Sequence, residues 1–107
     1  MSLNDDFRGA DSWRKARPTV SHHAFHAGFV AVMEGKPFDY ALLDMMTEYE
    51  QHRYENGREV AMECRHARLN VRWSRPDAVP RMLRDFITSR ALSRRARLPR
   101  TDPYRCR

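Results

Sequence analysis

Apolar residues recur at helical spacing in three stretches of the chain, and no stretch shows the alternation that predicts a β-strand. The first stretch predicts a helix over residues 22–34, because Ser21 is a suitable N-cap and Gly35 with Pro37 is a typical helix end. The apolar positions that share one face of this helix are Phe25, Phe29, Val32 and Met33.

The second stretch begins at Asp39, which is again a suitable N-cap. The pair Asn56-Gly57 lies in its middle, where a glycine costs about 1 kcal/mol relative to alanine. Either one long helix or two helices meeting at this pair would fit, and we favour one helix over residues 39–73. Its apolar face consists of Leu42, Met45, Met46, Tyr49, Val60, Cys64, Ala67 and Val71.

The third stretch predicts a helix over residues 77–96, capped by Asp77 and carrying Pro80 in its first turn, where the missing N–H is harmless. Its apolar stripe is formed by Val79, Leu83, Phe86 and Ile87. The prediction is therefore an all-α fold, with residues 22–34 and 39–73 as a helical hairpin and a third helix beside it. We expect a flexible arm over residues 1–19, a single helical domain over 20–97 and a flexible basic tail over 98–107.

The composition narrows the function classes. A chain of 107 residues with 41% hydrophobic residues can build a modest core but no deep substrate cleft. It holds no nucleophile elbow, phosphate-binding loop or HExxH motif, so we expect neither an enzyme nor a cofactor. No apolar run reaches the roughly 18 residues that cross a bilayer, which predicts a cytoplasmic protein without a membrane partner.

The charge is divided along the chain. Residues 1–64 contain seven lysines and arginines against eleven acidic residues, whereas residues 65–107 contain thirteen arginines against three aspartates. Arginine recognises phosphate and carboxylate groups in a planar, bidentate manner. The basic half could therefore bind RNA phosphates, or it could face an acidic surface of its own chain or of a partner protein.

Histidines and cysteines give weaker signals. His22 and His26 have the spacing of a helical metal-ligand pair, and Glu48 with His52 repeats it. Because no third and fourth ligand is evident, a solvated or capping cluster is the preferred interpretation, and we predict no metal site. The two cysteines lie far apart and outside any CxxC arrangement, so they predict neither a zinc ribbon nor a disulfide framework.

Two short motifs resemble a known family. Residues 28–36 read G-F-V-A-V-M-E-G-K, and Tyr54-x-x-Gly57 is followed by Arg58-Glu59. Both are similar to the helix signatures of ribosome modulation factor and related small bacterial and phage proteins, over about residues 27–61. The resemblance implies a helical hairpin that binds ribosomal RNA, with Lys36 and Arg58 at matched positions. The structural positions are Gly28, Phe29, Gly35, Tyr54 and Gly57, where the glycines permit close helix contact and a turn.

Two hypotheses from different classes follow. The first is a regulatory, ribosome-associated or RNA-binding protein, in which Trp73 beside Arg72 could stack on RNA bases. Its predicted nucleic-acid contacts are Lys36, Arg58, Arg68, Arg72, Trp73, Arg81, Arg84, Arg90, Arg94, Arg95 and Arg97. The second is a helical interaction module, for instance a phage or accessory-element regulator that docks on an acidic host protein, with a homodimer as a further option.

Overall fold

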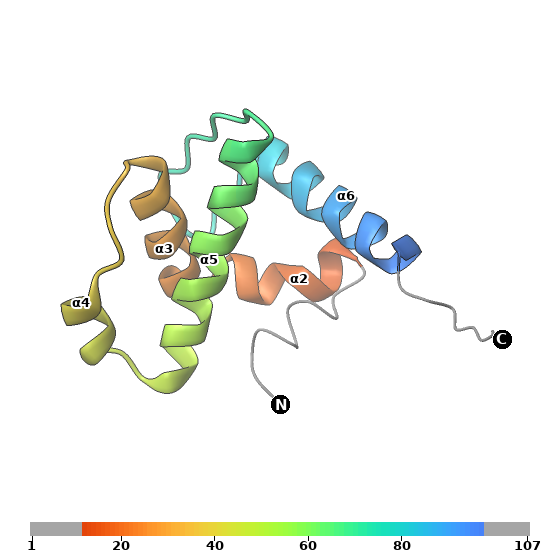
Figure 1. Ribbon diagram of the computed structural model, residues 1–107. Helices are drawn as coiled ribbons and strands as arrows, with labels where there is room; N and C mark the ends of the chain where they lie inside the picture. The colour runs from red at the N-terminus through yellow and green to blue at the C-terminus, as the bar shows by residue number, and fades with distance from the viewer. Residues whose placement is uncertain (1–11, 98–107) are drawn as a thin grey trace, which may run out of the picture.

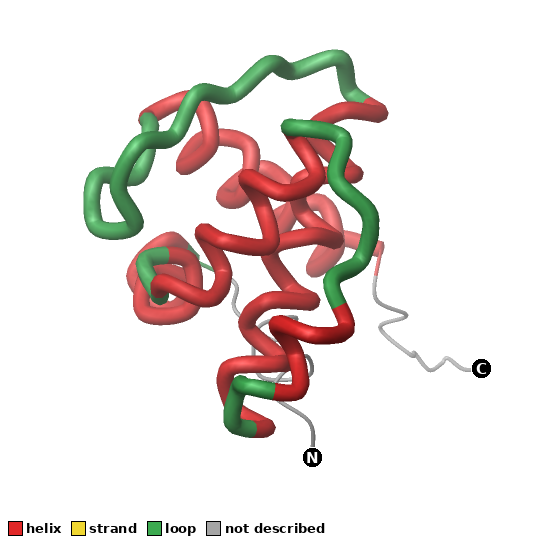
Figure 2. The backbone as a smooth tube through the Cα atoms, turned by 90° about the vertical axis from the view of Figure 1, so that its left-hand side faces the viewer, coloured by secondary structure: helices red, strands yellow, loops and turns green. Residues whose placement is uncertain are grey.

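The computed structural model describes residues 12–97, with the backbone alone described for residues 91–97 (Figure 1). Over this range the chain is helical and contains no strand, so the all-α prediction is confirmed. The helices are α2 (Trp13–Val20), α3 (His23–Met33), α4 (Tyr40–Asp44), α5 (Glu48–His66) and α6 (Arg81–Arg97). Figure 2 shows the same chain from the side, with the long segment between α5 and α6 passing over the helices.

The central unit is the pair of helices α3 and α5, which lie side by side in both views (Figures 1 and 2). Their closest approach is at Gly28 and Gly57. A Cβ atom at Gly57 would lie 2.8 Å from the carbonyl carbon of Phe25 and would overlap its oxygen. Residues without a side chain are therefore required on both helices, because backbone meets backbone there.

The core surrounds this contact. Phe25 and Phe29 of α3 are fully buried, and Tyr54 of α5 is 1% exposed. The main apolar cluster also includes further residues of α3 and α5 and residues of α2, of the segment after α5 and of α6: Ala16, Val20, Val32, Val60, Ala61, Cys64, Val71, Trp73, Leu83 and Ile87. A smaller cluster packs Leu43 of α4 against Ala24 and Tyr54. The pair of α3 and α5 thus forms the centre of the core, and residues of α2, α4 and α6 complete it.

Helix α3 ends at Gly35, which adopts φ +74°, the left-handed conformation that glycine takes at little cost. The N–H of Lys36 donates to the carbonyl of Ala31 at 2.8 Å, and the N–H of Gly35 donates to Val32 at 2.9 Å. These two hydrogen bonds close the helix and direct the chain toward α4. At its other end, α3 is capped by His22, whose Nδ1 accepts a hydrogen bond from the N–H of Ala24, and not by Ser21 as predicted.

The helix expected over residues 39–73 starts as predicted, with Asp39 as the N-cap of α4, but it is interrupted after Asp44 and ends early, although α5 runs without interruption through Gly57. The short helix α4 stops at Asp44, and α5 begins after Thr47, whose hydroxyl accepts from the N–H of Glu50 while the Glu50 carboxylate accepts in return. This reciprocal cap starts a new helix within an apolar pattern that looks continuous.

Helix α5 also ends earlier than expected, at His66. Arg68 adopts φ +62°, and the N–H of Leu69 donates to the carbonyl of Cys64 at 2.8 Å, which closes the helix. The third predicted helix is α6, which begins at Arg81 and not at residue 77. A proline disfavours the helical conformation of the residue before it, so Pro80 keeps Val79 out of the helix.

The predicted flexible arm over residues 1–19 is wrong for its later part, where α2 forms. The hydroxyl of Ser12 caps this helix by accepting from the N–H of Lys15, and Ala16 and Val20 are buried in the core. Its buried residues Ala16, Thr19 and Val20 follow helical spacing, but the helix is short and contains Pro18, so sequence reasoning did not identify it. The remaining part of the arm and the basic tail over 98–107 lie outside the described residues.

Candidate nucleic-acid interface

The segment that follows α5 alternates between buried and exposed residues. Val71 is 5% exposed and Trp73 is 7% exposed, whereas Arg72 between them and Arg75 beyond them are exposed. An extended chain points successive side chains to opposite sides, so each buried apolar residue sends its neighbours outward. The core thereby holds this segment in place and directs Arg72 to the solvent, and the chain then turns at Arg75.

Trp73 is the anchor of the segment. Its ring lies 5.3 Å from Phe29 and 4.8 Å from His26, measured between centroids, in edge-on arrangements. The indole N–H donates to the carbonyl of Arg75 at 2.6 Å, and His26 Nε2 lies 2.9 Å from the carbonyl oxygen of Trp73. This burial is a correction to the expected base stacking by Trp73, because the ring has no free face to offer.

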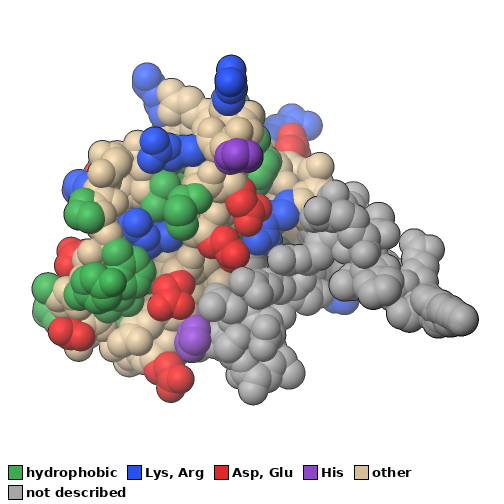
Figure 3. All heavy atoms as spheres, viewed as in Figure 1, with side chains coloured by type: hydrophobic (Ala, Val, Ile, Leu, Met, Phe, Trp, Pro, Cys, Tyr) green, Lys and Arg blue, Asp and Glu red, His purple; other side chains and the backbone are tan. Residues whose placement is uncertain are grey.

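Exposed arginines accumulate over the segment and the first turn of α6. We call this set the arginine edge, and it consists of Arg68, Arg72, Arg75, Arg81 and Arg84. Asp77 and Asp85 are the acidic residues within the same stretch. In Figure 3, blue side chains gather along the upper margin, over the segment after α5, and red ones lie over α5 itself. None of the five forms an ion pair with a described residue.

Two positions matched by the family resemblance contact their own chain. The guanidinium of Arg58 lies over the ring of Phe38 at 5.4 Å and over that of Tyr54 at 6.0 Å, and it donates to the carbonyl of Lys36 at 3.4 Å. The ammonium of Lys36 is 3.1 Å from the Glu34 carboxylate. Arg58 therefore helps to hold the turn after α3, and Lys36 carries a partly neutralised charge.

Arg90 is also bound within the fold. Its guanidinium donates to both carboxylate oxygens of Glu63, the second at 2.9 Å, and lies 3.6 Å from Glu59. The Arg90 side chain is 13% exposed. A two-pronged pair of this kind ties α6 to α5 and leaves little of Arg90 for a phosphate. The side chains of Arg94, Arg95 and Arg97 lie outside the described residues.

The histidine cluster is structural in this fold. His22 caps α3 and stacks on His23 at 4.4 Å, while His23 Nε2 is 3.3 Å from the Glu50 carboxylate. Burial, and then the nearby His23 and Arg53 charges, lower the pKa of His22 against a weaker opposing effect of Glu50. Across residues 12–97, no three histidine, cysteine, aspartate or glutamate side chains converge as a metal site would require.

Sequence reasoning missed Arg75. The alternation Leu69-x-Val71-x-Trp73 would place it on the buried side, and it is exposed because the chain turns there, with the N–H of Ala78 donating to the carbonyl of Arg75. Within the described residues, no helix combines the length and the apolar character that crossing a membrane requires.

No protein-family model, curated protein or solved structure matches this chain.

Proposed function

We propose that this chain is a non-enzymatic RNA-binding protein whose arginine edge contacts the phosphate backbone, with ribosomal RNA as the expected target. The observation that carries the proposal is the placement of Arg72 and Arg75. Both are exposed on a segment whose neighbours Val71 and Trp73 are buried. Burial of Val71 and Trp73 in the core thus fixes the segment that carries these two guanidinium groups.

The electrostatics of the edge support phosphate as the ligand. Arginines without an intramolecular carboxylate partner keep their full charge and their hydrogen-bond donors for a ligand. Guanidinium groups recognise phosphate oxygens through paired N–H donors. Because the segment is already ordered by its buried residues, binding does not have to supply the entropy of fixing its backbone. Contacts to the backbone of RNA carry little sequence information, so we expect broad RNA specificity.

The similarity to ribosome modulation factor supports the ribosome as the setting. The matched positions Lys36 and Arg58 contact their own chain, however, so the proposal assigns the RNA contacts to residues that follow the region of resemblance. A regulatory role on the ribosome remains part of the proposal, and it requires binding to ribosomal particles as well as to free RNA.

Fluorescence anisotropy with a labelled single-stranded RNA oligonucleotide tests the proposal. Each phosphate contact on a single strand contributes roughly 0.7 to the slope of log affinity against log salt, so five contacts predict an affinity loss of about 100-fold between about 50 and 200 mM salt. Changing Arg72 and Arg75 together to glutamine should weaken binding and reduce that slope by about 1.4.

The matched control changes Arg14 and Arg17 to glutamine. Both are exposed residues of α2, outside the arginine edge, and their replacement removes the same net charge. The control should weaken RNA binding less than the Arg72 and Arg75 change does, because it removes the same charge without removing a residue of the arginine edge. A flat salt response, or equal losses in the two double variants, would refute the proposal, and co-sedimentation with ribosomes tests the setting.

A further inference from the structure

Two polar side chains of α5 are buried while most of their polar atoms lack a partner. Arg53 is 7% exposed, and Asn56 is fully buried. Nε and Nη1 of Arg53, and both polar atoms of the Asn56 amide, form no hydrogen bond with any residue that the structure describes. Residues three apart are neighbours on the surface of a helix, so the two side chains lie together. Buried polar groups are normally hydrogen-bonded and buried charges normally paired, so this cluster lacks a partner that would satisfy it.

The guanidinium of Arg53 is held beside the N-terminal end of α3. Its Nη2 donates to the hydroxyl of Tyr49 at 2.9 Å, and its Cζ lies 4.4 Å from the centre of the Tyr49 ring. The same ring meets that of His22, the N-cap of α3, edge-on at 5.5 Å between centroids. The N-terminal end of a helix carries a partial positive charge, which adds to the charge of the guanidinium. The cluster therefore favours a negatively charged partner.

The acidic residue that is next along α5 does not neutralise Arg53. The carboxylate of Glu50 accepts from the N–H of Thr47 at 3.0 Å, as part of the helix cap, and lies 3.3 Å from His23 Nε2. No ion pair joins Arg53 to a described carboxylate. Burial, and then the charges of His23 and Arg53, lower the pKa of His22, which places the positive charge of the guanidinium beside this ring.

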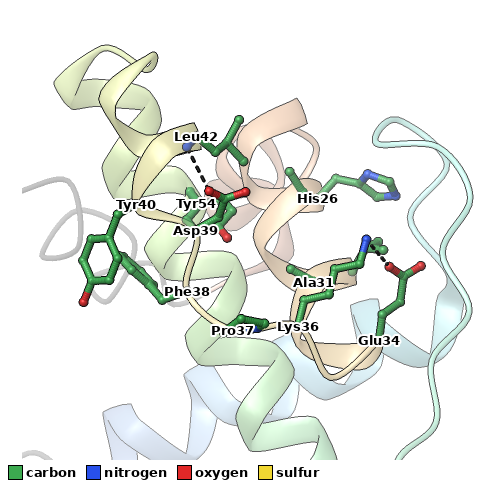
Figure 4. A pocket seen from close by; sticks show the side chains of 12 residues that line it. His26, Ala31, Glu34, Lys36, Pro37, Phe38, Asp39, Tyr40, Leu42 and Tyr54 are labelled. Carbon is green, nitrogen blue, oxygen red and sulfur yellow. Dashed lines mark hydrogen bonds and ion pairs between the residues drawn. The ribbon is translucent and has the colours of Figure 1, made fainter.

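A cavity beside α3 does not supply the missing partners. It has a volume of about 470 Å³, lies between α3 and the segment that leads into α4, and includes Tyr54 of α5 in its wall (Figure 4). Neither Arg53 nor Asn56 contributes to that wall. The ring that lies over the guanidinium belongs instead to Tyr49, which is 46% exposed, so the cluster borders the solvent on the Tyr49 side.

We propose that Arg53 and Asn56 bind an oxyanion, a carboxylate or a phosphate group, at the N-terminal end of α3. Oxygen atoms of the anion accept hydrogen bonds from the guanidinium and from the Asn56 amide, and the anion neutralises the buried charge. Nε and Nη1 of Arg53 have no contact with solvent in this conformation, so the exposed Tyr49 side chain rotates to admit the anion. The site is separate from the arginine edge and does not depend on RNA binding.

Two sources can supply the oxyanion. One is a free phosphate or carboxylate in solution, and the other is the carboxylate of Asp5 or Asp6, which lie outside the described residues. The described chain begins at Ser12, the N-cap of α2, and the eight residues of α2 lead toward His22 beside the cluster. A helix of that length measures about 12 Å, whereas six extended residues span about 20 Å, so these aspartates are able to reach Arg53.

Urea unfolding at constant ionic strength, titrated with inorganic phosphate and separately with acetate, tests the site. An anion that binds only the folded chain, at about tenfold above its Kd, lowers the unfolding equilibrium constant about tenfold. The effect should saturate, whereas general exclusion of phosphate from the protein surface does not. Arg53→Met removes the charge and should abolish the saturable effect. Arg14→Met is the matched control, because it makes the same change at an exposed position of α2, and it should retain the effect.

Occupation by the chain's own carboxylates gives a different pattern. The saturable effect is then absent from the unmodified chain and appears when Asp5→Asn and Asp6→Asn are combined, because neutral side chains leave the cluster vacant. If Arg53→Met fails to fold, Asn56→Leu provides the test and should weaken the phosphate effect. No saturable effect of either anion in either chain, or an effect that survives the Arg53 and Asn56 variants, would overturn the proposal.

The arginine edge is tested apart from this site. Changing Arg72 and Arg75 to glutamine should leave the phosphate effect on unfolding unchanged, because neither residue belongs to the cluster. Loss of that effect in this double variant would assign the phosphate to the arginine edge and contradict the site at Arg53. A failure of RNA binding has no bearing on the unfolding experiment, so the two proposals succeed or fail separately.

Discussion

Replacing Gly28 with alanine tests the helix contact on which the fold depends. A Cβ atom at this position would lie 3.0 Å from the carbonyl carbon of Tyr54 and would overlap its carbonyl oxygen. Both are backbone atoms of α5 and cannot rotate away as a side chain could. We therefore expect α3 and α5 to separate by about 1 Å, a gap that forfeits roughly a quarter to a half of the dispersion energy of each contact across it.

The size of the effect follows from what the contact buries. Phe25, Phe29 and Tyr54 lie at or beside it, and burial of each stabilises the fold by about 1.5–3 kcal/mol. Losing part of that packing costs about 3 kcal/mol, while alanine recovers about 1 kcal/mol of helix propensity. The net expectation for Gly28→Ala is a destabilisation of about 2 kcal/mol, a large fraction of the stability of a small domain.

Urea unfolding followed by far-UV circular dichroism measures this loss, which should appear as a lower midpoint with an unchanged slope. The matched control is Gly35→Ala, where a Cβ atom meets nothing within 4 Å but φ is +74°. It should cost about 1 kcal/mol through backbone strain alone. Combined with Gly57→Ala, the Gly28→Ala effect should be less than additive, because one separation relieves both overlaps. Unchanged or increased stability of Gly28→Ala would refute the reasoning.

Three further predictions concern buried or half-buried groups. Burial raises the pKa of the Cys64 thiol to about 12, so the reactive thiolate is scarce at pH 8. In a Cys106→Ser variant, a thiol reagent at pH 8 should therefore label Cys64 only as fast as the chain unfolds, and rapid labelling of the folded protein would contradict this. The amide of Asn56 is fully buried and has no hydrogen-bond partner among the described residues, so Asn56→Leu should stabilise the fold by about 1 kcal/mol in urea unfolding, and a loss would show that the amide is needed. The pKa of His22 is lowered mainly by burial, so its contribution to stability is present above its ordinary value of 6.5 and is lost as the pH falls through the lowered value. His22→Asn, which retains a capping side chain, should flatten that dependence between pH 8 and pH 5; an unchanged profile would exclude His22 as its source.

Local patterns in the sequence determined much of the framework. The helical spacing of Phe25 and Phe29 predicted α3 to within about one residue at each end, since an amphipathic period is written into neighbouring positions. The turn at Gly35 was predicted for the same kind of reason, because the left-handed conformation favours glycine there. The charge division was plain from the residues alone.

Contacts between distant residues decided the rest. The apolar pattern runs on through Met45 and Met46, so it could not show that Leu43 packs on Ala24 and that the chain turns before α5. Helix α2 is only eight residues long and contains Pro18, and it is stable because Ala16 and Val20 reach the common core. Helix propensity and spacing report only local preference, whereas burial depends on which elements meet.

The arginines show the limit most clearly. Arg84 and Arg90 lie on the same helix and have the same chemistry, so sequence alone placed both in the nucleic-acid surface. In the fold, Arg90 meets Glu63, a residue 27 positions away, and is held there, whereas Arg84 remains exposed with its guanidinium 5.8 Å from the Trp13 ring. Charge is a property of the residue, but its availability to a ligand depends on which side chains the tertiary structure brings beside it.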